Sequence, residues 1–437
     1  MLPLSRKVTL FGNDRGMRRT TARVKSQLGR LALARAQRRN FDLSKVSFIP
    51  QATVMPLKRD GLDPLPELDK ISADGPITRW PLPFGPKAWL VTGHEATRQV
   101  LSDRSSYSTD IRHLLGEAAA QHIGGLGFTD PPDHTRLRKI LSPEFTMRRL
   151  AHLAPRIQEI VDRRLDAVEA AGPTVDLVQS FAVPIPFEVI CELIGLPPGR
   201  RAEFHQLGQA RFDVSGGGIS TIGAVSESRA YLFDEVRRQR KTPGEGLLGR
   251  IIRDHGHEVD DHDLGGLLDG LFTGGFETTA SMLSLGSLLL LRDPSHFALV
   301  RDDDEAIDRV VEEMLRYLTV VQIAFPRFAK QDMELFGQPV AAGDVVICSL
   351  SAADRDSSLG PDMGRFDPHR KPVPHFAFGH GFHRCVGAEL ARMELRCAYP
   401  SLARRFPGMK LAVDPQDLAF RKLSLVFGVE ELPVHLG

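Results

Sequence analysis

A short run that contains a single cysteine, residues 376–387, constrains the fold more than any other part of the chain. Gly379 and Gly381 allow the backbone to turn tightly with positive φ. A helical pattern then begins near Val386, directly after Cys385. A thiol at the start of a helix meets free N–H groups and the positive end of the helix dipole. Such surroundings lower the pKa of a thiol and predict a metal ligand.

Two further positions of this run suit a flat ligand. Gly387 has no side chain to keep a ring away from the backbone, and Phe378 could pack beneath that ring. The residues alone leave three other interpretations open. Cys385 could be a small core residue, and Gly379-x-Gly381 is half of a dinucleotide-binding fingerprint, although no βαβ pattern surrounds it. A zinc site is the third, but its candidate ligands lack the short, regular spacing of structural zinc sites: His369, His375, His380, His383 and Cys385.

The rest of the chain predicts a mainly α fold with a small β portion. Apolar residues at i, i+3 and i+4 predict helices at 150–170, 181–194, 225–240, 264–291, 303–318 and 386–406. Short strands are expected at 77–80, 88–92 and 345–349. A long irregular stretch, 352–381, precedes the cysteine, and such stretches inside compact domains usually have a function.

The first 47 residues form a basic N-terminal extension, whereas residues 48–437 are expected to form one catalytic domain. Residues 1–40 contain 11 Lys and Arg but one acid, and the other 397 residues carry a net charge of −9. The extension is compatible with a membrane-surface helix, a targeting segment or a flexible, solvated tail. Its apolar stripe (Val24, Leu28 and Leu31) is thin, which favours the tail. The mildly acidic remainder argues against nucleic acid as a partner.

The spacing of the cysteines and the hydropathy of the chain indicate in which cellular compartment the protein works. The four cysteines show no paired spacing such as C-x-x-C, which favours a reducing compartment and hence a cytoplasmic protein. No apolar run reaches the ~18–20 residues of a membrane span. We therefore expect no transmembrane anchor and no secretory leader.

The cysteine run also resembles a known family. Residues 378–387 match the haem-binding loop of cytochromes P450, F-G-x-G-x-H-x-C-x-G, at every fixed position. The chain is thereby identified as a haem-thiolate monooxygenase similar to the soluble bacterial members. The resemblance implies the cytochrome P450 fold, with haem b between the long helix near 264–291 and the helix after the cysteine. It makes Cys385 the iron ligand and assigns Phe378, Gly379, His383 and Gly387 to the cofactor site.

A second motif lies on the long helix, where residues 273–279 resemble the family's A-G-x-[DE]-T-[ST] oxygen-binding segment. Gly274 replaces the usual alanine and should slightly loosen the helix. By resemblance, Gly275 contacts the cofactor, and Glu277 and Thr278 form the catalytic acid–alcohol pair that delivers protons. From the residues themselves, mid-helix glycines cost about 1 kcal/mol each. Thr278 can also donate to a carbonyl of the preceding turn.

A third set resembles the family's structural lock. Glu313 and Arg316 match its E-x-x-R, and Arg370 is the arginine of its F-x-P-x-R. The resemblance implies that these three residues hold the irregular stretch against the core. One departure is visible, because the usual N-R-D is Asp354-Arg-Asp356 here, so we expect this loop to be capped differently.

Four basic residues resemble the family's contacts to the haem propionates. His134 and Arg138 match its H-x-x-x-R pair, and Arg327 and His383 occupy the other two positions. A pair at i, i+4 can face one ligand, and a guanidinium fits a carboxylate geometrically. These four assignments depend on position within matched motifs.

The resemblance implies that one oxygen atom of O2 is inserted into an apolar small molecule by hydroxylation or epoxidation. Secondary metabolism or lipid and xenobiotic oxidation is the expected context. The alternative is oxidative coupling or peroxide-driven chemistry. Since no reductase-type segment is seen, electrons should come from a ferredoxin or flavodoxin that docks near Arg384, Arg392 and Arg396. Two segments, 105–128 and 204–240, are expected to line a pocket with these residues: Tyr107, His113, Leu114, Leu115, Leu126, Phe204, Phe212 and Val214.

Overall fold

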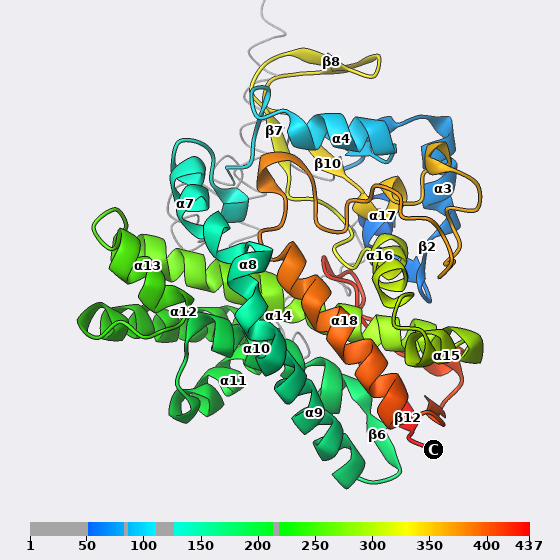
Figure 1. Ribbon diagram of the computed structural model, residues 1–437. Helices are drawn as coiled ribbons and strands as arrows, with labels where there is room; N and C mark the ends of the chain where they lie inside the picture. Colours follow the sequence, from blue (N-terminus) through cyan, green and yellow to red (C-terminus); the bar gives the residue numbers. More distant parts are fainter. Residues whose placement is uncertain (1–50, 83–85, 111–125, 213–217) are drawn as a thin grey trace, which may run out of the picture.

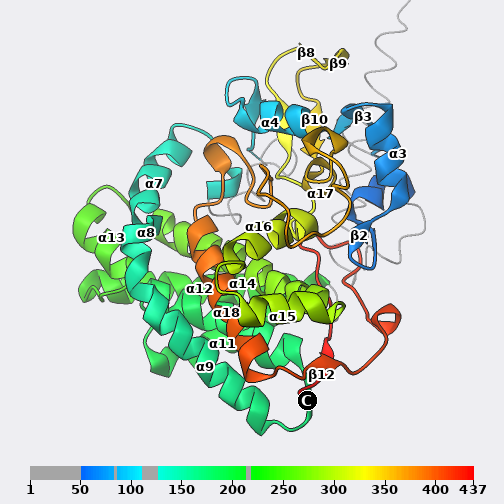
Figure 2. The same ribbon diagram turned by 45° about the vertical axis from the view of Figure 1, so that its right-hand side comes forward.

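The structure is a computed structural model that describes residues 51–82, 86–110, 126–212 and 218–437. The predicted N-terminal extension, residues 1–47, lies outside this part of the chain. The described residues are mostly helical, with a small sheet packed beside the helices, as predicted (Figures 1 and 2). Among these residues, no helix combines the length and the hydropathy that crossing a bilayer requires.

The three strands predicted from the sequence are neighbours in one five-stranded sheet. Its order is β3-β4-β10-β7-β5, with β4 parallel to β10 and the other pairs antiparallel. The strands are β3 (Ile77–Trp80), β4 (Ala88–Val91), β5 (Tyr107–Ser108), β7 (Arg327–Ala329) and β10 (Val345–Cys348). Every residue of β4 and β10 is buried, which explains why both read as continuous apolar runs. The indole of buried Trp89 donates to Asp344 Oδ2 at 2.9 Å.

All six predicted helices are present, with bounds that differ by at most seven residues. They are α9 (Ala154–Ala170), α10 (Pro184–Ile194), α12 (Gly218–Lys241), α14 (Asp261–Leu291), α16 (Ile307–Leu318) and α18 (Ala388–Arg405). The other helices are α2 (Gln51–Val54), α3 (Pro66–Asp74), α4 (His94–Ser102), α7 (Asp133–Leu141), α8 (Met147–Leu150), α11 (Pro198–Phe212), α13 (Leu247–His255), α15 (Pro294–Asp302) and α17 (Leu350–Ala353). The remaining strands are β1 (Arg59–Asp60), β2 (Asp63–Pro64), β6 (Thr174–Asp176), β8 (Met333–Leu335), β9 (Gln338–Val340), β11 (Lys410–Leu411) and β12 (Pro433–His435).

The crossing of α14 and α18 organises the helical part (Figure 1). The C-terminal half of α14 is buried on all sides, as expected for a helix that is apolar all round. Tyr399 of α18 donates from its hydroxyl to the Met282 carbonyl of α14 at 2.6 Å. A Cβ on Gly286 would lie 2.0 Å from that hydroxyl oxygen. Only glycine therefore lets the two helices approach this closely.

A buried charge network holds the irregular stretch before the cysteine. Arg316 is 1% exposed and donates to both carboxylate oxygens of Glu313 at 2.7 Å. It also donates to the main-chain carbonyls of Asp354 and Met363, each at 2.8 Å. Arg370 donates to Glu313 Oε1 at 3.1 Å. The predicted lock formed by Glu313, Arg316 and Arg370 is thus confirmed.

Asp354, at the position where the related motif has asparagine, extends this network to the cysteine run. Its carboxylate is fully buried and accepts hydrogen bonds from the Phe376 N–H at 2.6 Å and the Thr319 hydroxyl at 2.9 Å. Burial raises its pKa to about 6, although His375 and the two donors oppose the shift. Asp354 thus caps this loop by accepting from one main-chain N–H and one hydroxyl, and whether this capping differs from that of an asparagine stays a prediction.

Replacing Arg316 by leucine should lower the free energy of unfolding by about 3–5 kcal/mol, because the carboxylate of Glu313 would lose its main buried partner. Arg301 pairs with Asp302 at the surface, so Arg301→Leu should change stability by about 0–1 kcal/mol. Urea denaturation of both variants measures the difference. Equal effects of the two substitutions would contradict the structural role of the network.

Asp354→Asn should change how stability depends on pH. A carboxyl group whose pKa is about 6 when folded and near 3.8 when unfolded binds its proton more tightly in the native state. The wild-type protein therefore loses stability as the pH rises from about 4 to about 6, by about 3 kcal/mol in total. The asparagine variant lacks this loss. Its free energy of unfolding relative to wild type should rise across that interval in urea titrations, and a constant difference would refute the assignment.

Candidate active site

The cysteine run turns where the sequence predicts. Gly379 and Gly381 have φ values of +64° and +69°. A Cβ on Gly381 would lie 2.2 Å from the carbonyl oxygen of Leu101 at the end of α4, so this position requires glycine for space as well as for conformation. The Cys385 N–H donates to the Phe378 carbonyl at 2.8 Å. The turn thereby fixes the backbone of the cysteine.

The Cys385 thiol lies deep in the protein, yet its side chain keeps accessible surface. It is therefore not part of the close-packed core. Helix α18 begins at Ala388, two residues later than predicted, with Gly387 at its N-cap. Burial raises the pKa of the thiol, and the Gly387 N–H and Arg138 oppose this shift. The predicted net lowering of this pKa is thus not observed, because desolvation outweighs the nearby positive groups.

Four basic side chains gather beside the cysteine run, as the motifs predict. The imidazole rings of His134 and His383 lie 4.4 Å apart between centroids. Burial lowers the pKa of His134 to about 4 and that of His383 to about 3. It also lowers the pKa of Arg138, while the nearby Cys385 opposes that shift. Arg327 is 4% exposed, and its pKa is likewise lowered by burial.

Thr109 and Asp130, which the sequence motifs did not single out, support the group of four basic side chains. Thr109 shares a hydrogen bond of 3.2 Å with His383 Nε2. Asp130 accepts from the Thr109 N–H and hydroxyl, each at 2.9 Å. Neither residue belongs to a fixed motif position, so no sequence signal pointed to this role. Together they orient the His383 ring from the side of β5.

The oxygen-binding segment is a continuous part of α14. The Thr278 hydroxyl donates to the Gly274 carbonyl at 2.5 Å, which confirms the predicted bond to the preceding turn. A Cβ on Gly274 would meet no atom within 4 Å, whereas a Cβ on Gly275 would lie 2.8 Å from Ile190 Cδ1 of α10. Gly275 thus permits the close packing of α10 on α14, and its expected cofactor contact stays a prediction. Gly274 is the glycine that borders open space.

Glu277, the predicted catalytic acid, is held by a residue distant in sequence. Arg421 Nη1 donates to Glu277 Oε1 at 2.9 Å, and each side chain is 20% exposed. Arg421 lies in the segment between β11 and β12. No local sequence pattern links residues 144 positions apart, so this partner of Glu277 was not predicted.

These groups fit haem b, which has an iron atom, a flat ring and two carboxylates. The Cys385 thiol is accessible, and both ring nitrogens of His134 are buried without a hydrogen-bond partner in the described part of the chain. For the buried Arg327 guanidinium, the hydrogen bond observed is to the Phe325 carbonyl. Buried donors and cations of this kind require an anion. The two propionates of haem b would supply it.

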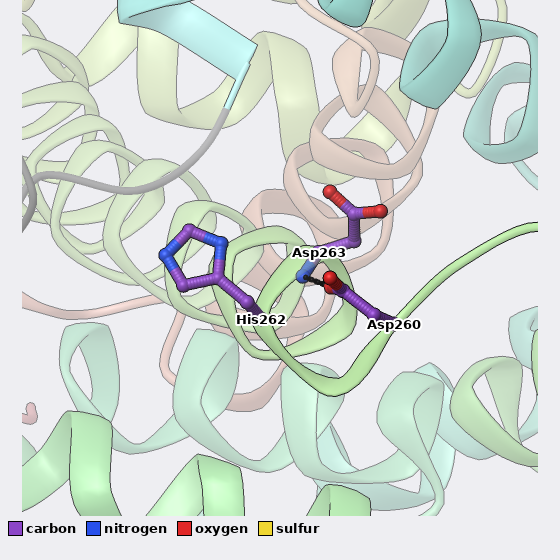
Figure 3. A group of neighbouring side chains, drawn as sticks. All are labelled: Asp260, His262 and Asp263. Atoms are coloured by element: carbon purple, nitrogen blue, oxygen red, sulfur yellow. Dashed lines mark hydrogen bonds between the residues drawn. The ribbon is translucent and has the colours of Figure 1, made fainter.

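The zinc alternative receives no support from the described residues. The group of potential metal ligands found there is Asp260, His262 and Asp263, at the start of α14 (Figure 3). Asp260 Oδ1 accepts from the Asp263 N–H at 2.7 Å and so caps the helix. Arg136 donates to both carboxylate oxygens of Asp263 at 2.8 and 3.1 Å. Capping and ion pairing account for both acids without a metal.

The arginines expected at a docking face have different surroundings. Arg384 is exposed. Arg392, in contrast, is 11% exposed and donates to both carboxylate oxygens of Glu312, at 2.6 and 2.9 Å. Its guanidinium lies 4.6 Å from the ring centre of Phe378, so it supports the cysteine run from inside. Arg396 pairs with Asp308 at 2.7 Å.

The predicted pocket segments are only partly described. Residues 111–125 and the side chains of 208–226 lie outside the described part, and with them His113, Leu114, Leu115, Phe212 and Val214. Leu126 is partly buried. Tyr107 is 5% exposed within the sheet, and Phe204 is fully buried against Tyr231 and Phe272. The assignment of Tyr107 and Phe204 to a pocket lining is thus wrong, because both side chains are packed in the core.

Comparison with known proteins agrees with this geometry. Residues 236–427 match the family model described as cytochrome P450. Cytochrome P450 165B3 of Amycolatopsis orientalis is 40% identical over 389 residues, which cover 86% of this chain and 97% of that protein. OxyE, a cytochrome P450 involved in teicoplanin biosynthesis, superimposes with a TM-score of 0.82 at 38% identity, over 87% of this chain and 99% of that one.

A further solved structure is OxyC, a cytochrome P450 implicated in an oxidative C–C coupling reaction during vancomycin biosynthesis. It superimposes with a TM-score of 0.79 at 39% identity, over 86% of this chain and 95% of that one. The similarities extend over nearly the whole length of these proteins and include the cysteine run and the helices around it. The chain belongs to the cytochrome P450 family of haem-thiolate oxidoreductases.

Proposed function

We propose that this enzyme inserts one oxygen atom of O2 into an apolar small molecule of secondary metabolism. The observation that carries the proposal is the buried group of His134, Arg138, Arg327 and His383 beside an accessible Cys385 thiol. This arrangement suits a flat cofactor with two carboxylates and a thiolate ligand. Haem bound through Cys385 supplies oxygen activation, because the thiolate donates electron density that favours cleavage of the O–O bond.

The four basic residues have a binding and orienting role. Arg138 and Arg327 present guanidinium groups suited to the propionates. His134, which its low pKa keeps neutral near pH 7, can donate one N–H group to the same carboxylates. His383 donates its Nε2–H to the Thr109 hydroxyl, because that hydroxyl donates to Asp130. Thr109 and Asp130 fix the His383 ring. The chain thereby sets the orientation of the ring relative to α14.

Thr278 and Glu277 have the proton-transfer role. The partial exposure of Glu277 gives its carboxylate access to solvent protons. Thr278 can both donate and accept, so its hydroxyl can pass a proton onward once it leaves the Gly274 carbonyl. A positioned acid and alcohol of this kind contribute about 10²–10⁴-fold to rates in other enzymes. The intact pair favours the use of O2 over peroxide.

We further propose that a ferredoxin or flavodoxin supplies the electrons at the face of the cysteine run. The exposed side chain of Arg384 supports this site, whereas Arg392 is committed to Glu312. A cytoplasmic location is proposed as well. It is supported by the four cysteines, all of which are free thiols.

A second candidate function is oxidative coupling. It is favoured by the similarity to OxyC, which is implicated in oxidative C–C coupling during vancomycin biosynthesis. Coupling would join two groups of the substrate and remove two hydrogen atoms, without retaining an oxygen atom. Both candidates use the same cofactor site, so the product distinguishes them.

A screen of natural-product libraries for the ligand-induced spin shift of the haem should identify a substrate. Turnover under ¹⁸O2 should then give a product that carries one ¹⁸O atom. Mass spectrometry measures this outcome directly. A product that lacks two hydrogen atoms and contains no ¹⁸O would overturn oxygen insertion, and a new bond between two groups of the substrate in that product would establish coupling.

Thr278→Ala should uncouple electron consumption from product formation, because the hydroxyl that passes the proton is removed. We expect the product formed per electron pair to fall by about tenfold or more, with hydrogen peroxide formed instead. Ser287→Ala is the matched control, since Ser287 makes the same bond to a preceding carbonyl of α14, at 2.7 Å. Both variants should keep the thiolate–haem CO spectrum. Unchanged coupling in Thr278→Ala would remove the proton-transfer role.

A further inference from the structure

The segment between β11 (Lys410–Leu411) and β12 (Pro433–His435) folds back on itself close to α14. Phe420 and Val429 form an antiparallel bridge, and the Arg421 N–H donates to the Gly428 carbonyl at 2.9 Å. The rings of Phe420 and Phe427 are stacked with centroids 5.5 Å apart. We call residues 419–430 the C-terminal hairpin. These contacts make it an ordered platform for the Arg421 side chain.

The hairpin closes against the same turns of α14 that carry the predicted acid. A Cβ on Gly428 would lie 3.0 Å from Ser281 Oγ and 3.2 Å from Cδ and Nε of Arg421. Ser281 follows Glu277 by one helical turn, so Gly428 fits between α14 and the arginine stem. A Cβ at this position would require the side chain of Ser281 or Arg421 to move by a few tenths of an ångström. Gly428 thus lies in close contact with both α14 and Arg421.

A second set of contacts connects the hairpin to the chain leading to Arg327. The Phe427 N–H donates to the Val320 carbonyl at 2.7 Å, and the Gln322 N–H donates to the Leu425 carbonyl at 3.1 Å. Gln322 also donates from its amide to the Ser424 carbonyl at 2.8 Å. The hairpin is thus fixed on two sides, by residues 320–322 and by α14. Arg421 has little freedom to follow Glu277 if the acid moves.

Arg421 directly determines where the Glu277 carboxylate lies. The Nη1–Oε1 distance of 2.9 Å is that of a charge-assisted hydrogen bond. A carboxylate held by a guanidinium is stabilised in its ionised form and in one orientation. At the next residue, the Thr278 hydroxyl is bonded to the Gly274 carbonyl. In this arrangement both proton-transfer groups are engaged by the protein itself.

We propose that Arg421 is the positioning residue of the proton relay, which holds the Glu277 carboxylate in the orientation from which it takes up solvent protons and passes them to Thr278. The inference rests on the proposed function, since it assigns a role within the same relay. Arg421 acts through Glu277 and contacts neither cofactor nor substrate in this role. The competing explanation is that the ion pair contributes only to the stability of the fold.

The test uses the haem-loaded full chain with Arg421→Gln, Arg421→Lys, Glu277→Gln and the Arg421→Gln/Glu277→Gln double variant. Lys422→Gln is the matched control, because Lys422 is the adjacent exposed cation. The product formed per electron pair should fall about 3- to 10-fold in Arg421→Gln and recover in part in Arg421→Lys. The KM and the substrate-induced spin shift should stay at wild-type values. In the Glu277→Gln background, Arg421→Gln should cause no further loss.

An infrared titration without turnover gives an independent readout. Loss of the neighbouring positive charge favours the protonated acid. The carboxyl band of protonated Glu277, assigned by its absence in Glu277→Gln, should therefore appear at higher pH in Arg421→Gln than in wild type. Two results would overturn the inference. One is that Arg421→Gln lowers the product formed per electron pair equally in the wild-type and Glu277→Gln backgrounds. The other is that the infrared band of protonated Glu277 appears at the same pH in Arg421→Gln as in wild type. If Glu277→Gln and Thr278→Ala leave coupling unchanged, the relay itself fails, which is a distinct outcome.

Discussion

The buried charge network centred on Glu313 is the interaction on which the active site depends. The stretch before the cysteine, residues 352–381, contains little regular structure, and fixing each residue of such a chain costs about 1–2 kcal/mol of entropy. Arg316 and Arg370 offset this cost by donating to main-chain carbonyls along the stretch, including those of Met363 and Arg365. Asp354 carries the same network to the Phe376 N–H, where the cysteine run begins. The position of Cys385 is therefore set by charges buried far from the thiol.

Much of the fold and of the active site could be predicted from the sequence, because the residues that define these features lie close together along the chain. The turn at Gly379 and Gly381, the helix after Cys385 and the Glu313–Arg316 pair each lie within a few residues of one another. The residue types alone did not decide the role of Cys385; the resemblance of the whole run did. Arg370 is remote from Glu313, and its partner was found only because a family motif connects the two.

The parts that could not be predicted depend on long-range packing. The pKa of Cys385 was expected to fall from its place before a helix, but burial by surrounding chain raises it. Which of two adjacent glycines faces open space depends on the position of Ile190 on another helix. Phe204 has the apolar character of a pocket residue, and only its neighbours show that it is a core residue.

The C-terminal hairpin is a second case in which residues distant in sequence set the geometry of the active site. A relay acid on α14 needs a defined orientation, yet α14 supplies only the backbone from which Glu277 projects. The orientation comes from Arg421, which is 144 residues away and is fixed by the segment that follows α16. That segment continues into β7, which begins with Arg327, one of the residues proposed to bind the haem propionates. Proton delivery and cofactor orientation thus share one support, and a displacement of residues 320–322 would disturb both at once.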